Sequence, residues 1–281
     1  MKKIGVIGCG PWGMKLVRVF RELGVLKAVC DKDQTKLLDI KDTGILLSLD
    51  YPSLLQRDLD GIVIATPAET HYRIARDALV AGKDVLVEKP MTLDCIEARD
   101  LVSLAKNQIL MVGHVLLYHP TIQRIKQNLK DLGTITHIIS TRLNWGRFRD
   151  YENCWWSFAP HDISVILYLL DKMPIRYRVH GDQNCTQTLL EFGGGERAYI
   201  QVSWLYPTKM HRLVVVGDKG KIEFDGLKPT IPEPLKEEAK HFIECIETRK
   251  KPLTDGKHGL RVIKVLERCD SKMKHQNGLH V

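Results

Sequence analysis

Two adjacent charged residues, Glu88 and Lys89, follow an apolar run at residues 85–87 and precede Pro90. A lysine accepts a proton from an alcohol when burial or a nearby cation lowers its pKa. In open α/β sheets, ligands bind beyond the carboxyl ends of the strands, so Lys89 is a candidate general base if this run is a strand. A solvated ion pair after an ordinary strand explains the same residues equally well.

Residues 8–13 read Gly-Cys-Gly-Pro-Trp-Gly, between a strand-like run at 3–7 and a helical spacing at 16–23. In this context the pattern predicts a dinucleotide-binding turn. Gly8 permits the tight turn, Gly10 lets the backbone approach a pyrophosphate, and Gly13 allows close packing of the helix. A glycine-rich turn without a ligand is the alternative.

Asp31 ends the second strand-like run, 21 positions after Gly10. A carboxylate at this place receives the ribose hydroxyls of NAD and repels the 2′-phosphate of NADP, so NAD is the expected cofactor. An aspartate after a strand is also a common turn former.

Strands and helices alternate in the first part of the chain, with expected strands at 3–7, 26–30, 61–65, 84–88 and 109–113. Alternation predicts an α/β Rossmann domain, which we expect to span residues 1–117. Longer β-type runs follow at 134–144, 175–180, 186–192, 198–206, 212–217 and 221–224, with helices near 120–132, 160–170, 234–249 and 257–272. Residues 118–281 therefore predict an α+β domain with a mostly antiparallel open sheet.

The composition limits the class of partner. The 281 residues include 42 Lys and Arg against 34 Asp and Glu, but the basic residues are dispersed. We expect either a generally basic surface or a positive cleft that attracts an anionic small molecule, and no nucleic acid. Seven cysteines without a zinc spacing indicate reduced thiols of a cytoplasmic protein. Because no apolar run approaches roughly 20 residues, we expect neither a membrane span nor a signal peptide.

Four stretches together resemble the Gfo/Idh/MocA oxidoreductases, a family that includes glucose–fructose oxidoreductase and inositol dehydrogenase. They are residues 8–13, Ala-Thr-Pro-Ala-Glu-Thr-His at 65–71, Val-Glu-Lys-Pro at 87–90 and Trp-Ser-Phe-Ala-Pro-His-Asp-Ile at 156–163. The resemblance covers nearly the whole chain. It implies that one face of the open sheet serves the substrate and the other an oligomer contact, and hence a homo-oligomer, either a dimer or a tetramer.

The resemblance also implies roles for single residues. Lys89 would reach the substrate hydroxyl, Glu88 would lie near the nicotinamide ribose, and a cis peptide would precede Pro90. The implied cofactor-binding residues are Gly8, Gly10, Pro11, Trp12, Gly13, Asp31, Thr66, Pro67, His71, Glu88 and Lys89.

His161 matches the catalytic histidine of the family, and its unperturbed pKa suits proton transfer near neutral pH. The two aspartates of the family motif fall on Ser157 and Ser164, so the chain lacks the aspartate of the usual Lys, Asp, His set. Asp162 is adjacent to His161 and is a candidate to orient it. An isolated histidine at a helix start is more often structural.

Residues 113–120, 142–149 and 159–164 resemble a subgroup that acts on nucleotide-activated sugars, including UDP-N-acetylglucosamine 3-dehydrogenases. Arginines offer bidentate phosphate ligands and tryptophans offer faces for a sugar or base, although Trp145, Trp155 and Trp156 suit a core or an interface equally well. The expected substrate-binding residues are His114, Trp145, Arg147, Arg149, Ser157, His161 and Asp162. His114 and His119 lie five apart, unlike a helical metal pair, so we expect no metal.

These features predict an NAD-dependent dehydrogenase in which Lys89 and His161 handle the proton. The expected substrate is a secondary hydroxyl of a nucleotide-activated sugar, such as UDP-N-acetylglucosamine at C3, in polysaccharide biosynthesis. Two alternatives stay open: a dehydrogenase of a free sugar or cyclitol, and a dinucleotide-binding regulator without turnover, which Ser157 suggests.

Overall fold

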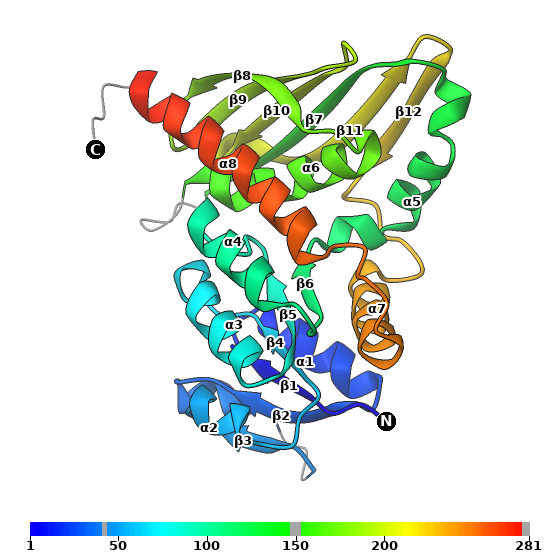
Figure 1. Cartoon of the computed structure of the whole chain (residues 1–281). Helices are drawn as coiled ribbons and strands as arrows, with labels where there is room; N and C mark the ends of the chain where they lie inside the picture. The colour runs from blue at the N-terminus through cyan, green and yellow to red at the C-terminus, as the bar shows by residue number, and fades with distance from the viewer. Residues whose placement is uncertain (41–43, 147–152, 277–281) are drawn as a thin grey trace. The chain divides into compact units, whose positions relative to one another are not determined.

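The computed structural model describes residues 1–40, 44–146 and 153–276 (Figure 1). The chain forms two compact units. The first unit contains Met1–Val115 and Glu233–Leu260, and the second contains Leu116–Pro232 and Arg261–Val281. The expected boundary at residue 117 lies two residues after the first crossing, whereas residues 233–260, which the sequence assigned to the second domain, return to the first unit.

The first unit is built on a six-stranded parallel sheet in the order β3-β2-β1-β4-β5-β6. Its strands are β1 (Ile4–Ile7), β2 (Leu26–Cys30), β3 (Leu46–Ser48), β4 (Gly61–Ile64), β5 (Asp84–Glu88) and β6 (Leu110–Gly113). Strands β1, β4, β5 and β6 are buried along their whole length, as expected for a parallel sheet covered on both faces. The order reverses between β1 and β4, which is where dinucleotides bind in such sheets.

Helices cover both faces of this sheet because right-handed crossovers leave β1 and β4 in opposite directions. The helices are α1 (Gly13–Glu22), α2 (Tyr51–Leu55), α3 (His71–Val80), α4 (Cys95–Leu104) and α7 (Pro234–Thr248), with short 3₁₀ turns at Gln34–Leu37 and Ala68–Thr70. Helix α3 contacts α2 and α4, whereas α1 contacts α7. The sequence did not indicate β3 or α2, because both are short and the three residues of β3 are not buried.

The returning helix α7 is anchored at its middle and just after its end. Phe242 packs edge-on against Phe20 of α1. After the last turn, Arg249 donates from Nη1 to Asp84 Oδ2 at 2.6 Å and from Nη2 to Asp84 Oδ1 at 3.2 Å. This pair ties residues near position 249 to the start of β5.

The second unit is built on a six-stranded sheet in the order β12-β11-β7-β10-β9-β8. Its strands are β7 (Ile135–Trp145), β8 (Pro174–Gly181), β9 (Cys185–Phe192), β10 (Arg197–Ser203), β11 (Leu205–Gly217) and β12 (Gly220–Asp225). Only the β7–β10 pair is parallel among these described strands. The α/β domain followed by a mostly antiparallel open sheet is confirmed.

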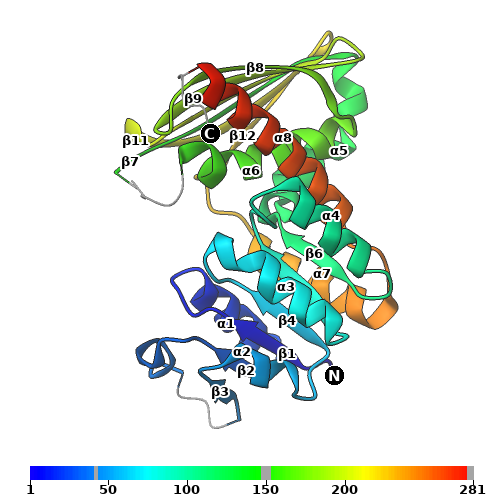
Figure 2. The same ribbon diagram turned by 60° about the vertical axis from the view of Figure 1, so that its left-hand side comes forward.

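Helix α6 (Cys154–Leu170) lies along one face of this sheet (Figures 1 and 2). It begins six residues before the expected start at 160 because the Asn153 side chain accepts a hydrogen bond from the Trp156 N–H at 3.0 Å and caps it. The remaining helices are α5 (Pro120–Gln127), α8 (Gly256–Gln276) and the 3₁₀ turns Val115–Tyr118 and Leu129–Leu132. The Trp155 indole N–H donates to the Leu266 carbonyl of α8, so α8 packs against α6.

Candidate functional site

The glycine loop after β1 has the geometry that a pyrophosphate needs. Gly8 has a φ of +99°, and a Cβ there would lie 2.6 Å from the Ala65 backbone. A Cβ at Gly13 would lie 1.9 Å from the Gly8 carbonyl oxygen, so only glycine allows α1 to start here. At Gly10 no described atom lies within 4 Å of a Cβ, which leaves open space for a phosphate beside the backbone. Pro11 and Trp12, between these glycines, are exposed.

Asp31 is held at the end of β2, next to the glycine loop. Its Oδ2 accepts from the Cys9 N–H at 2.7 Å and its Oδ1 accepts from the Asp33 N–H at 2.9 Å. Lys36 lies 3.6 Å from Oδ1. The carboxylate is thus fixed beside the loop, at the place from which ribose hydroxyls are bound in this fold.

Glu88 connects three segments at the carboxyl edge of the sheet. Its Oε1 accepts a hydrogen bond from the Trp12 indole N–H, and its Oε2 accepts one from the Lys89 backbone N–H at 3.2 Å. A Cβ on Gly113 of β6 would lie 2.8 Å from Glu88 Oε1, so the carboxyl group rests on this glycine. Burial raises the pKa of Glu88 to about 7, and the Trp12 donor and the charge of Lys89 oppose this effect.

Lys89 follows directly after β5 and is half-buried, and the peptide bond between Lys89 and Pro90 is cis, as the resemblance implied. His71 supports this turn because its Nδ1 lies 2.8 Å from the Pro90 carbonyl oxygen. Its Nε2 lies 2.8 Å from the carbonyl oxygen of Thr66, so the ring joins the turns after β4 and β5. Thr66 itself is half-buried and Pro67 is exposed. Burial lowers the pKa of His71, and the two carbonyls oppose that effect.

His114 lies one residue beyond β6 with only 2% of its surface exposed. Neither of its ring nitrogens has a hydrogen-bond partner among the described residues. Its ring stacks edge-on against His258 of α8, with centroids 5.4 Å apart. Burial, followed by the nearby His258 and Lys89, lowers the pKa of His114 well below its ordinary value, so the ring is neutral at pH 7.

In the second unit, His161 and Asp162 lie in the middle of α6, and Ser157 lies one turn before them. His161 is half-buried, whereas Asp162 is 2% exposed. Asp162 accepts hydrogen bonds from Ser140 Oγ at 2.8 Å and from Arg142 Nε at 2.8 Å, both on β7. Its carboxylate therefore faces the sheet.

Arg142 also donates from Nη2 to His211 Nε2 at 2.6 Å. Burial, and then the Arg142 charge, lowers the pKa of His211 to about 4, so the neutral ring accepts this bond. Neither residue was expected at the site. The signal available in the sequence was the alternation that places Ser140 and Arg142 on the same face of β7.

The three tryptophans near the expected substrate region differ in exposure. Trp155 is fully buried, which supports the core reading, and Trp156 is 9% exposed. Trp145, at the end of β7, is 61% exposed and pairs in register with Leu205 of β11. Arg147 and Arg149 lie outside the described residues.

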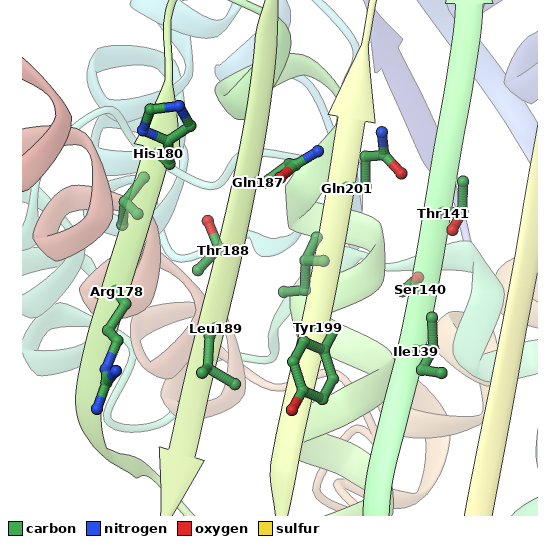
Figure 3. A pocket seen from close by; sticks show the side chains of 12 residues that line it. Ile139, Ser140, Thr141, Arg178, His180, Gln187, Thr188, Leu189, Tyr199 and Gln201 are labelled. Carbon is green, nitrogen blue, oxygen red and sulfur yellow. The ribbon is translucent and has the colours of Figure 1, made fainter.

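The face of the second sheet opposite α6 carries a shallow cavity of about 420 Å³. Figure 3 shows Arg178, His180, Gln187, Tyr199 and Gln201 around it, on β8, β9 and β10. Ser140 also lies along this cavity, and its hydroxyl donates to Asp162 of α6. Within the described residues, no group of three His, Cys, Asp or Glu side chains is arranged to hold a metal ion.

Profiles of known families match both units. The profile of the oxidoreductase family with an NAD-binding Rossmann fold (GFO_IDH_MocA) matches residues 2–114, and the GFO/IDH/MocA C-terminal domain profile matches residues 122–223. The chain belongs to the Gfo/Idh/MocA oxidoreductase family. The suspected family is thereby confirmed, and the glycine loop belongs to the domain of this family that binds a dinucleotide.

Individual members of the family are similar over different lengths. A UDP-N-acetylglucosamine 3-dehydrogenase of Acidithiobacillus ferrooxidans is 29% identical over 184 residues, which are 64% of this chain and 58% of that protein. A crystal structure of that dehydrogenase superposes with a TM-score of 0.87 at 21% identity, over 98% of both chains. A scyllo-inositol dehydrogenase of Lactobacillus casei, with bound NAD(H) and scyllo-inositol, gives a TM-score of 0.89 at 17% identity, over 98% of both chains.

Within the described residues, no helix combines the length and apolar character needed to cross a membrane.

Proposed function

We propose that the protein is an NAD-dependent dehydrogenase that oxidises a secondary hydroxyl of a sugar. The observation that carries this proposal is the shared edge of the first sheet, where the glycine loop, Asp31 and Lys89 follow β1, β2 and β5. Parallel strands bring their carboxyl ends to one edge, so a cofactor held by the loop has Lys89 beside it. NAD supplies the hydride acceptor when it is bound.

Lys89 acts as the base that takes the hydroxyl proton, and His161 shares or completes the transfer. Lys89 is half-buried directly after β5. Asp162 does not stand in for the family aspartate in this proposal, because Arg142 and Ser140 already bind its carboxylate. Asp162 instead attaches α6, the helix that carries His161, to β7. Ser157 lies one turn before His161 on the same helix.

NAD is proposed over NADP because Asp31 sits next to the loop as a carboxylate that would repel a 2′-phosphate. A nucleotide sugar is proposed as substrate because the relatives similar over most of the chain include a UDP-N-acetylglucosamine 3-dehydrogenase. Exposed Trp145 suits stacking on a sugar or base, and His114 offers two buried nitrogens to a polar ligand. A role in polysaccharide biosynthesis follows from that substrate.

We also infer a homo-oligomer that uses the open face of the second sheet. Ile139 and Tyr199 are each about 40% exposed on this face, in neighbouring strands. Light scattering after gel filtration tests the oligomer, and a monomer at micromolar concentration contradicts it.

A cytoplasmic location is inferred from the buried free thiols Cys9, Cys30 and Cys154.

The test of the activity is to incubate the purified protein with NAD and with a panel of substrates while the absorbance of the reduced cofactor is followed. The panel contains UDP-N-acetylglucosamine, the corresponding UDP-sugar oxidised to the uronic acid at C6, free N-acetylglucosamine and scyllo-inositol. A coupled aminotransferase removes a 3-keto product whose equilibrium is unfavourable. Reduction of NAD with a UDP-sugar alone is the expected result. Reduction of NAD only with inositol or a free sugar would show that the substrate is not a nucleotide sugar. No reduction with any substrate, despite NAD binding, would indicate a regulator without turnover.

A further inference from the structure

A second charged side chain, Lys36, lies beside Asp31 at the end of β2. Its Nζ is 3.6 Å from Asp31 Oδ1. The lysine side chain is 43% exposed and the aspartate side chain is 8% exposed, so the ammonium group reaches the carboxylate from the solvent side. Both residues belong to the first unit. A ligand that approaches Asp31 from solvent therefore meets Lys36 as well.

The backbone between these two residues fixes the position of Lys36. Oδ1 of Asp31 accepts a hydrogen bond from the Asp33 N–H at 2.9 Å. Asp33 in turn caps the 3₁₀ turn Gln34–Leu37, because its Oδ1 accepts from the Thr35 N–H at 3.0 Å and from the Thr35 hydroxyl at 2.6 Å. The Lys36 N–H donates to the Asp33 carbonyl oxygen at 3.2 Å. The segment thus folds back on itself and returns Lys36 to the carboxylate.

Lys32 is closer to Asp31 in sequence, but it does not form this pair. Its side chain is exposed, and among the described residues the cation that pairs with the Asp31 carboxylate is Lys36. Lys32 therefore carries the same charge in the same segment without the contact, which makes it a control for the role of Lys36.

Asp31 and Lys36 act differently on the two dinucleotides. A carboxylate at this place accepts hydrogen bonds from the ribose hydroxyls of NAD and repels the 2′-phosphate of NADP. An ammonium group attracts that phosphate as a point charge, whereas the neutral hydroxyls of NAD gain little from it. The Lys36 charge also offsets part of the Asp31 charge. Lys36 therefore opposes the discrimination that Asp31 imposes.

We propose that Lys36 determines how strictly the site excludes NADP: its ammonium group binds the 2′-phosphate and so allows NADP to bind beside Asp31, more weakly than NAD. The inference deepens the proposed function, and it requires only that the glycine loop binds a dinucleotide. Two opposed residues then set the choice of cofactor, one that selects NAD and one that tolerates NADP.

The test uses ADP-ribose and its 2′-phosphate, which differ only at the 2′ position and need neither a nicotinamide nor a sugar substrate. Lys36→Met keeps the length of the side chain and removes its charge, whereas Lys36→Arg keeps a cation. Lys32→Met is the matched control. Calorimetric titration measures the affinity of each protein for both ligands.

We expect Lys36→Met to bind the 2′-phosphate about tenfold more weakly, as for a lost contact between charged groups, and to bind ADP-ribose within about twofold of the unchanged protein. Lys36→Arg and Lys32→Met should keep both affinities. The same comparison in an Asp31→Ser background, where the carboxylate no longer repels the phosphate, covers the case in which the unchanged protein binds the 2′-phosphate too weakly to measure. There, too, adding Lys36→Met should weaken the 2′-phosphate about tenfold.

Equal ratios of the two affinities in Lys36→Met and Lys32→Met, in both backgrounds, overturn the inference. The expected dependence on Lys36 without oxidation of any sugar refutes the proposed function alone. Failure of both ligands to bind in either background shows that the glycine loop is not a dinucleotide site, and both proposals are then wrong.

Discussion

Arg142 donates hydrogen bonds from Nε and Nη2 to the two carboxylate oxygens of Asp162, at 2.8 and 3.2 Å. Arg142 belongs to β7 and Asp162 to α6, and Ser140 adds a third bond from the same strand. The carboxylate that is adjacent to His161 in sequence thus attaches α6 to the sheet. Because α6 also carries His161, this attachment fixes the position of the histidine within its unit.

Breaking this pair should destabilise the second unit. Asp162→Ala leaves the Arg142 guanidinium, which is only 15% exposed, without its carboxylate, and should lower the free energy of unfolding by about 3–5 kcal/mol. Asp171→Ala, in the exposed pair with Arg261 at the end of the same helix, should cost about 1 kcal/mol or less through that pair. Urea unfolding measures both. Similar losses of unfolding free energy for the two variants would show that the buried pair stabilises the unit no more than the exposed pair does.

The fold was predictable because its signals are local. The glycine spacing, the apolar runs and the alternation of strands and helices can each be recognised within about 30 residues. Together they predict the order of the elements. Glu238, which is fully buried on the apolar face of α7, has no such signal. Its pattern is one charged residue in an apolar helical stripe, which a sequence also shows at surfaces. The return of residues 233–260 to the first unit depends on tertiary contacts such as Arg249 with Asp84.

The expected site residues also differ in how far local sequence predicts them. Asp31 and Gly10 could be placed because the chemistry of a phosphate-binding turn fixes their spacing. The role of Asp162 could not be read from its position beside His161, because neighbours on a helix point in different directions. Only the structure shows that this side chain faces β7.

Replacing Lys89 should separate binding from chemistry. Lys89→Met keeps the length of the side chain and removes the base, so turnover should fall about 10²- to 10⁴-fold while NAD affinity changes little. Lys106→Met, at an exposed lysine after α4, is the control. Steady-state rates and a separate NAD titration give the two quantities. Loss of NAD binding in parallel with turnover would assign Lys89 to the cofactor instead.

Replacing Asp31 should relax the choice of cofactor. Asp31→Ser keeps an acceptor for the Cys9 N–H but removes the charge that opposes a 2′-phosphate, so the ratio of NADP to NAD affinity should rise about tenfold or more. Asp39→Ser, at an exposed aspartate in the same segment, should leave that ratio unchanged. Fluorescence titration with both cofactors measures it. An unchanged ratio in Asp31→Ser would mean that another group selects the cofactor.

A methyl group at Gly113 should disturb Glu88 without touching the glycine loop. Its carbon would lie 2.8–3.0 Å from the Glu88 carboxyl atoms, so Gly113→Ala forces the carboxyl away from the Trp12 indole at a cost of about 1–3 kcal/mol. NAD binding should weaken, and the fluorescence of the exposed Trp12 should change. Gly193→Ala, at an exposed glycine of the second unit where an added Cβ would meet no atom within 4 Å, is the matched control. Unaltered NAD affinity in Gly113→Ala would separate Glu88 from cofactor binding.

His211 should make the second unit sensitive to acid. The pKa of His211 is lowered from 6.5 to about 4, chiefly by burial, so below pH 6.5 the unfolded chain binds a proton that the folded chain refuses. Stability should therefore fall as the pH drops from 6.5 to 4, by about 3 kcal/mol from this group. His211→Gln keeps an acceptor for Arg142 and does not titrate, so its unfolding free energy should decline less over this range. His180→Gln, at an exposed histidine on β8, should follow the unchanged protein. Urea unfolding at pH 7, 5.5 and 4.5 measures the three curves, and identical slopes for all three would exclude His211 as the source of the acid sensitivity.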